Sequence, residues 1–244
     1  MHPDPLNTPA PRLADVRACI VDLDGTMVDT LGDFEVALNR SLSELGYPSV
    51  SRRLIGERVG RGSEHLLRGV LALLGAAPDA DQVPGEVLAR AWEAYQRHYA
   101  SVNGCFSDVF DGVRPGLQAL RSGGLPLACL TNKPRDFACA LLDRKGLAPF
   151  FGPVFGGDSF ERQKPDPLPV RATCEALGLA PAQVLMVGDS VNDALAARAA
   201  GCPVVLVTYG YNHGQPVRAV DADAFVDSLA ELPQLLLPSS ASLS

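Results

Sequence analysis

The chain of 244 residues carries a formal net charge of −7, with 47% hydrophobic and 20% charged residues. These values are typical of a soluble globular protein and argue against a disordered chain or a membrane protein. The negative charge argues against nucleic acid and anionic membrane surfaces as partners, because the summed field of the chain repels them.

Residues 1–14 are rich in proline and lack the apolar segment of a signal peptide or a membrane anchor. We expect a flexible leader there. The six cysteines show no metal-ligand spacing and most lie in apolar runs, which predicts buried free thiols and favours a reducing compartment. We therefore expect a cytoplasmic protein.

Short apolar runs alternate with helical patterns along much of the chain. The runs predict buried strands at 18–21, 125–130, 184–187 and 203–207. The helical patterns predict helices at 114–122, 135–145, 167–177 and 191–200. This alternation predicts an α/β fold with a doubly wound, Rossmann-like parallel sheet. In such a sheet ligands bind outside the carboxyl ends of the strands, so the residues after each run are the candidates for chemistry.

The segment 30–107 has no buried-strand pattern, and its apolar residues recur at helical spacing in three separate stripes. We interpret the stripes as packing surfaces rather than ligand sites. The sequence therefore predicts an inserted all-helical cap at 30–107 and a catalytic core formed by 15–29 and 108–238.

Two carboxylates, Asp22 and Asp24, follow the first predicted strand. Residues at i and i+2 leave a strand on the same side, so both can reach one site. Crowded carboxylates repel unless a cation neutralises them, and hard oxygen ligands suit Mg²⁺. A solvated acidic turn is the alternative, because Asp-Gly is a common turn sequence.

Candidate phosphate ligands follow the second predicted strand and precede a later helix. Thr131 and Asn132 offer a hydroxyl and an amide at a strand end, although they can equally cap a helix. Lys164 stands before a proline-stiffened helix entry and can neutralise a phosphate; a surface lysine is the alternative.

A second acidic pair, Asp189 and Asp193, follows the run 184–187. Asp189 suits either metal ligation or capping of the next helix. The order of the four groups along the chain, acidic pair, hydroxyl, lysine and acidic pair, favours one shared site over four coincidences.

Four stretches, DLDGTMVD, LTNK, QKPDP and GDSVND, resemble the four motifs of the haloacid dehalogenase superfamily in the family's order. The resemblance implies a helical cap and an aspartyl-phosphate mechanism, with Asp22 as nucleophile and Asp24 as general acid and base. Asp24 favours phosphoester hydrolysis over dehalogenation, because dehalogenases of this superfamily lack an acid at that position.

The resemblance also implies a set of ligands for the remaining residues. Mg²⁺ would be bound by Asp22, by the backbone carbonyl of Asp24 and by Asp189, with Asp193 behind them. The phosphoryl oxygens would be bound by Thr131, Asn132 and Lys164.

Residues 57–67 and 207–214 are similar to the phosphoglycolate phosphatase family within this superfamily. This similarity implies a small phosphate ester as partner, 2-phosphoglycolate above all, hydrolysed to glycolate and phosphate. The candidate specificity residues in the cap are Arg58, Gly60, Arg61 and Gly62. A flexible turn and solvated arginines are the alternative interpretation of that loop.

Several related activities stay open at the level of sequence. The four motifs bind only the phosphoryl group, so a pyrophosphatase, a sugar-phosphate phosphatase and a β-phosphoglucomutase-like isomerase all share them. The absence of lysine from 30–107 argues against phosphonatases that form a Schiff base in the cap. Nothing in the sequence indicates an oligomeric state.

Overall fold

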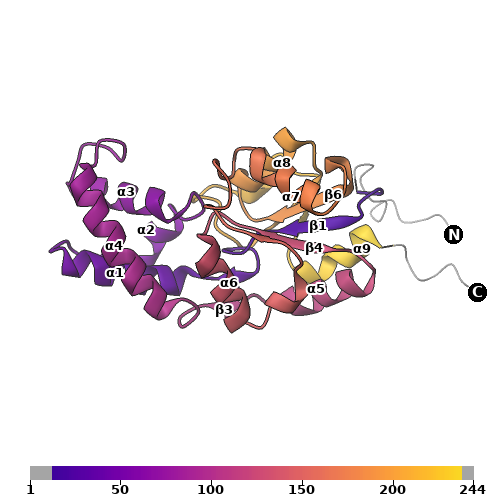
Figure 1. Ribbon diagram of the computed structural model, residues 1–244, viewed down its shortest axis with the longest axis horizontal. Helices are drawn as coiled ribbons and strands as arrows, with labels where there is room; N and C mark the ends of the chain where they lie inside the picture. The colour runs from indigo at the N-terminus through magenta and orange to yellow at the C-terminus, as the bar shows by residue number, and fades with distance from the viewer. Residues whose placement is uncertain (1–12, 238–244) are drawn as a thin grey trace, which may run out of the picture.

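The computed structural model describes residues 13–237, so residues 1–12 of the predicted leader lie outside the described part of the chain. Figure 1 shows two lobes, a sheet covered by helices and a group of helices beside it. Because the two lobes have separate hydrophobic cores, each is described in turn.

Six strands form the main sheet in the order β5-β4-β1-β6-β7-β8, and every pair of neighbours is parallel. Their bounds are β1 Ala18–Val21, β4 Leu127–Leu130, β5 Val154–Phe155, β6 Val184–Gly188, β7 Val204–Val207 and β8 Ala224–Val226. In the centre, Cys19 of β1 lies opposite Leu127 on one side and Leu185 on the other. The predicted parallel α/β sheet is confirmed, and the short strands β5 and β8 extend its edges.

Helices cover both faces of this sheet (Figure 1). One face carries α5 Val113–Ser122, α6 Arg135–Arg144 and α9 Leu232–Leu236, and the other carries α7 Leu168–Ala176 and α8 Val191–Ala200. Alternate residues of β1 serve the two faces: Cys19 and Val21 pack in the first core, Ala18 and Ile20 in the second. Burial on both faces explains why the strands appear as continuous apolar runs in the sequence.

Four helices make up the segment between β1 and the rest of the sheet, here called the helical insert (residues 30–107). They are α1 Leu31–Glu44, α2 Arg52–Gly56, α3 Ser63–Leu73 and α4 Gly85–Val102. The three predicted apolar stripes lie on α1, α3 and α4 and pack together in one core, which includes the fully buried Leu38, Leu67 and Tyr95. The short α2 has too few residues to show a periodic pattern.

A two-stranded antiparallel ribbon connects the insert to the sheet lobe. It pairs β2 Val28–Asp29 with β3 Asp108–Val109, so that Asp29 lies opposite Asp108. The chain therefore enters and leaves the helical insert at adjacent points. The ribbon flanks the predicted boundaries of the cap, which remain predictions.

All six cysteines lie in the described part of the chain and are free thiols. Four are buried as expected, whereas Cys139 is half-buried and Cys105 is exposed. Within residues 13–237, no helix combines the length and the apolar composition that crossing a membrane requires.

Asp33 fixes the end of the insert to its beginning. It lies in the first turn of α1, is fully buried, and its carboxylate accepts hydrogen bonds from the backbone N–H groups of Gly104 and Phe106, both at 2.7 Å. These two donors belong to the segment that returns the chain to the sheet. One side chain thus satisfies two backbone groups that folding removes from water.

We expect Asp33→Ala to lower the free energy of unfolding by about 2–4 kcal/mol, because it leaves two buried donors without an acceptor. For a chain of this length the corresponding fall in Tm is roughly 5–15 °C. Thermal unfolding followed by circular dichroism measures it. Replacement of the exposed Asp111 by Ala is the control, with an expected change below about 0.5 kcal/mol. Equal losses in the two variants would contradict this account.

Candidate active site

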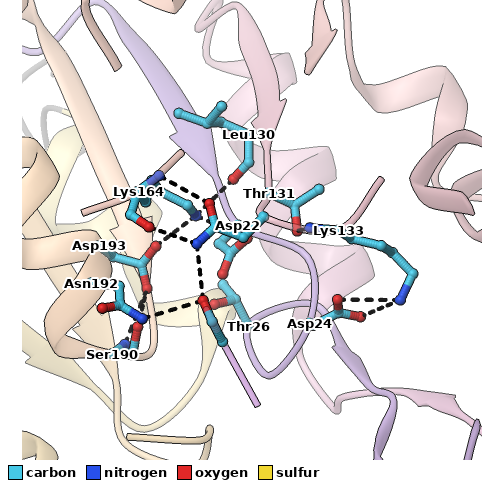
Figure 2. Close-up of polar contacts among 12 residues, drawn as sticks. Asp22, Asp24, Thr26, Leu130, Thr131, Lys133, Lys164, Ser190, Asn192 and Asp193 are labelled. Carbon is cyan, nitrogen blue, oxygen red and sulfur yellow. Dashed lines mark hydrogen bonds and ion pairs between the residues drawn. The ribbon is translucent and has the colours of Figure 1, made fainter. Parts of the chain in front are cut away.

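The loops that follow the central strands bring the predicted residues together at one edge of the sheet. Asp22 follows β1, Thr131 follows β4 and Asp189 follows β6. Lys164, from the loop before α7, reaches the same place, and Figure 2 shows it between Asp22 and Asp193. The carboxyl ends of parallel strands meet at one edge, which is why groups far apart in sequence converge there.

The ammonium group of Lys164 lies at the centre of this arrangement. Its Nζ is 3.0 Å from Asp22 Oδ1, 2.7 Å from Asp193 Oδ1 and 2.9 Å from the carbonyl oxygen of Leu130. Burial lowers the pKa of Lys164, but the charges of Asp193 and Asp22 outweigh this effect and raise the pKa above its usual value. Lys164 therefore stays charged in the interior.

Asp193 has both carboxylate oxygens engaged. Oδ1 accepts from Lys164, whereas Oδ2 accepts from Ser190 N at 3.1 Å, Ser190 Oγ at 2.9 Å and Asp189 N at 3.2 Å. These bonds satisfy backbone donors at the start of α8. The helix start is thus stabilised by Asp193 together with Ser190, and the side chain of Asp189 is directed to other partners.

Asp189 is held by two groups that the sequence did not single out. Oδ1 accepts from Thr26 Oγ1 at 3.2 Å, and Oδ2 accepts from the backbone N–H of Tyr211 at 2.5 Å. Gly25, with φ of +83°, passes so close that a Cβ there would overlap the Asp189 carboxylate. Only their positions in the sequence could have indicated these two residues: Thr26 belongs to the first motif, and Tyr211 to the stretch 207–214.

Three carboxylates crowd together at this point: Asp22, Asp189 and Asp193 each have an oxygen within 4.8 Å of the others. Burial, followed by the charges of the neighbouring carboxylates, raises the pKa of Asp189 well above its usual range. Burial is also the main cause that raises the pKa of Asp22 to about 7, although Lys164 opposes it. Such a cluster is costly unless a cation neutralises it.

The donor set fits a divalent cation. Asp22 Oδ1 is buried and, although Lys164 lies at an ion-pair distance, no donor in the described part of the chain is aligned to make a hydrogen bond with it. Carboxylate oxygens of this kind are the ligands that hard cations such as Mg²⁺ prefer. Both oxygens of Asp189 and of Asp193 accept hydrogen bonds, so Asp22 Oδ1 is the oxygen of this cluster best placed to bind an ion, and ligation by Asp189 stays a prediction.

Asp24 has a different partner from Asp22. Its two carboxylate oxygens lie 3.0 and 3.2 Å from Lys133 Nζ, and Figure 2 shows the carboxylate turned toward Lys133 and away from Lys164. Both aspartates nevertheless line the same pocket. As the i, i+2 spacing predicted, they reach one site, which they face from different sides.

The helical insert covers this pocket. The sheet lobe contributes Asp22, Asp24, Thr131, Asn132 and Lys133, and the insert contributes Phe34, Val59, Gly60, Gly62, Ser63 and Leu66. About 20 Å³ is open to the centre of a water molecule, which is room for about one water. The pocket is therefore narrow in this arrangement.

Asn132 joins the two lobes. Its Nδ2 donates to Gly60 O at 3.0 Å and to Lys164 O at 2.8 Å, while its Oδ1 accepts from Lys164 N at 3.0 Å. Asn192 Nδ2 donates to the same Gly60 oxygen at 3.2 Å. The amide of Asn132 thus positions Lys164 and docks the loop of the insert, and binding of a phosphoryl oxygen by its side chain stays a prediction.

The four predicted specificity residues fall in two groups. Gly60 and Gly62 line the pocket. Arg58 instead donates to Leu54 O at 3.3 Å, and Arg61 lines a separate surface groove beside α8. Neither arginine lines the pocket in this arrangement, and their contact with a substrate stays a prediction.

A family model described as haloacid dehalogenase-like hydrolase matches residues 16–201. Curated relatives named phosphoglycolate phosphatase match most of the chain. The protein of Thiobacillus denitrificans is 44% identical over 216 residues, 88% of this chain and 93% of that protein. The plasmid protein of Cupriavidus necator is 45% identical over 222 residues, 91% and 94% of the two chains.

The fold is similar to that of solved structures. The crystal structure of a predicted phosphoglycolate phosphatase from Haemophilus somnus has a TM-score of 0.85 and 30% identity, and covers 91% of this chain and 99% of that chain. Coverage of this extent includes the sheet lobe and the helical insert together.

The raised pKa of Asp22 predicts how stability depends on pH when no cation is bound. The contribution of Asp22 to the free energy of unfolding is fully present below the usual aspartate pKa of 3.8 and is lost as the pH rises through about 7. We therefore expect the Tm of the metal-free protein to fall between about pH 5 and about pH 8. Addition of Mg²⁺ should raise Tm more at the higher pH, since its ligands must be deprotonated.

Thermal unfolding with and without Mg²⁺ measures both effects. At a hundred times its Kd, an ion that binds only the folded chain stabilises it by about 2.7 kcal/mol, or roughly 5–10 °C in Tm. Asp189→Asn should raise the metal-free Tm at high pH and reduce the rise in Tm that Mg²⁺ causes. The control variant Asp143→Asn, at an exposed position, should change neither. An unchanged rise in Tm with Mg²⁺ in Asp189→Asn would exclude Asp189 as a ligand.

Proposed function

The chain belongs to the haloacid dehalogenase-like hydrolases and is a phosphoric monoester hydrolase, and we propose that it hydrolyses 2-phosphoglycolate with Mg²⁺, through an aspartyl phosphate formed on Asp22. The observation that supports the mechanism most directly is the placement of two carboxylates, Asp22 and Asp24, on different sides of one small pocket. One carboxylate can attack phosphorus while the other exchanges a proton with the leaving group.

In the first half-reaction a carboxylate oxygen of Asp22 attacks phosphorus, and the bond from phosphorus to the ester oxygen breaks. Asp24 donates a proton to that oxygen as glycolate leaves. Lys164, whose Nζ lies 3.0 Å from Asp22 Oδ1, stands where it can bind a phosphoryl oxygen beside the nucleophile. Thr131, also in the wall of the pocket, offers a hydroxyl to a second one.

In the second half-reaction water attacks the phosphorus of the aspartyl phosphate. Asp24, now ionised, accepts a proton from the water, and the bond from phosphorus to Asp22 breaks. Phosphate leaves and both aspartates return to their starting state. The exchange of acid and base roles by Asp24 makes the cycle balance in protons.

Mg²⁺ would be held by the carboxylates of Asp22 and Asp189 and by the backbone carbonyl of Asp24. Asp193 would stand outside this set of ligands and orient Lys164. When bound, Mg²⁺ supplies positive charge that offsets the carboxylates and the phosphoryl oxygens. Within the chain, Lys164 favours the ionised form of Asp22, whereas burial and the charge of Asp193 oppose it and raise the pKa of Asp22 to about 7.

The covered pocket favours a small substrate. Its free volume is small, and the insert contributes the apolar side chains of Phe34, Val59 and Leu66 to its wall. Ser63, the first residue of α3, brings a hydroxyl and the free N–H groups of a helix start to the same wall, an environment that suits a carboxylate. The relatives named phosphoglycolate phosphatase support glycolate as the leaving group.

We expect Asp22→Asn to lose phosphatase activity to background, because the amide is not a nucleophile toward phosphorus. Asp24→Asn should reduce kcat by about 10²- to 10⁴-fold, the usual contribution of a general acid and base. Steady-state phosphate release measures both, and rapid-quench experiments with ³²P-labelled substrate test for an acid-stable phosphoenzyme. Hydrolysis by Asp22→Asn at the rate of the unaltered enzyme would refute the mechanism.

A screen of phosphate esters in magnesium tests the substrate. We expect 2-phosphoglycolate to exceed pyrophosphate, hexose phosphates and nucleotides in kcat/KM by at least about tenfold, equal to about 1.4 kcal/mol of transition-state binding. A preference for pyrophosphate or a sugar phosphate would assign the corresponding phosphatase instead. Interconversion of sugar phosphates that depends on glucose 1,6-bisphosphate would assign the isomerase.

A further inference from the structure

Lys133 is a buried lysine without a role in the mechanism given above. Its side chain is 1% exposed, and its Nζ lies 3.0 and 3.2 Å from the two carboxylate oxygens of Asp24. It stands at the end of β4, next to Thr131 and Asn132, and lines the pocket with them. A buried ammonium group is costly unless its charge is balanced, and Asp24 provides that balance.

The helical insert encloses the other side of this ammonium group. Lys133 Nζ donates a short hydrogen bond to the hydroxyl of Tyr99 on α4 and lies 4.8 Å from the ring centroid of Phe34 on α1. The two rings contact each other, with centroids 5.4 Å apart. The Nζ also lies 4.6 Å from the ring centroid of Tyr99, so two helices of the insert hold the ammonium group through one hydrogen bond and two cation–π contacts.

We propose that Lys133 is a positioning residue of this site: it holds the Asp24 carboxylate at the pocket wall, and Tyr99 and Phe34 of the helical insert hold Lys133. The orientation of Asp24 thereby depends on the docked insert. This proposal rests on the role of Asp24 as proton donor given under the proposed function. Within residues 13–237 no other hydrogen bond or ion pair holds the Asp24 carboxylate, so its two contacts with Lys133 set the direction in which it points.

Lys133→Met tests the proposal, since methionine keeps the length of the side chain and removes the charge. The measured quantity is kcat/KM, which reports on steps up to departure of the leaving group. We use three esters: 2-phosphoglycolate and ethyl phosphate, whose leaving oxygen needs a proton, and p-nitrophenyl phosphate, whose leaving group does not. We expect a loss of about 10- to 100-fold for the first two and of about threefold or less for the third.

Each other outcome would overturn the proposal. An equal loss for all three esters would indicate a structural role for Lys133, and a rise in activity would indicate that Lys133 withholds Asp24 from the reaction. If kcat/KM falls for 2-phosphoglycolate alone, through a rise in KM, and does not fall for ethyl phosphate, Lys133 binds the substrate carboxylate instead.

A double-mutant cycle separates this inference from the proposed function. If Lys133 acts through Asp24, adding Lys133→Met to Asp24→Asn should cost no further activity. Asp24→Asn should itself show the same dependence on the leaving group; if it does not, the proposed role of Asp24 fails. If only Lys133→Met lacks that dependence, the positioning role alone fails.

Tyr99→Phe tests whether the helical insert holds Lys133. It also replaces Lys133→Met as the test if that variant does not fold. It removes one hydroxyl from the buried cluster and keeps the ring that contacts Phe34. We expect a loss of about 3- to 10-fold in kcat/KM for the two alkyl esters and little change for p-nitrophenyl phosphate. Circular dichroism and Tm verify folding, and an equal loss for all three esters would overturn the link.

Discussion

The buried ammonium group of Lys164 is the interaction on which the rest of the site depends. It joins the end of β1 through Asp22, the start of α8 through Asp193 and the end of β4 through Leu130. Three segments that are far apart in sequence thus share one charge. Because one lysine balances only part of the charge of three neighbouring carboxylates when these are ionised, a bound cation would offset the remainder.

Much of this arrangement could be predicted from the sequence, because a parallel sheet dictates it. Strands buried on both faces show up as apolar runs, and the residues that follow them, Asp22, Thr131 and Asp189, must meet at one edge. The edge strands β5 and β8 gave no such signal, because two or three residues do not form a recognisable run.

The contacts between the two lobes could not be predicted in the same way. Lys133 contacts Tyr99 only because the helical insert docks over the pocket, and helical periodicity indicates which face of α4 is buried but not which residues that face contacts. Asn132 illustrates the same limit. Its place after a strand suggested a phosphate ligand, whereas its amide spans Gly60 and Lys164.

The ribbon of β2 and β3 gives the molecule a property that the sheet alone would not have. Since Asp29 and Asp108 lie opposite each other, the chain joins the helical insert to the sheet lobe at two neighbouring points. A segment anchored in this way can be lengthened, shortened or exchanged without moving the strands that carry Asp22 and Asp189. Evolution can therefore alter which molecule is admitted while Asp22 and Asp189 keep their places, provided that Tyr99 and Phe34 continue to hold Lys133.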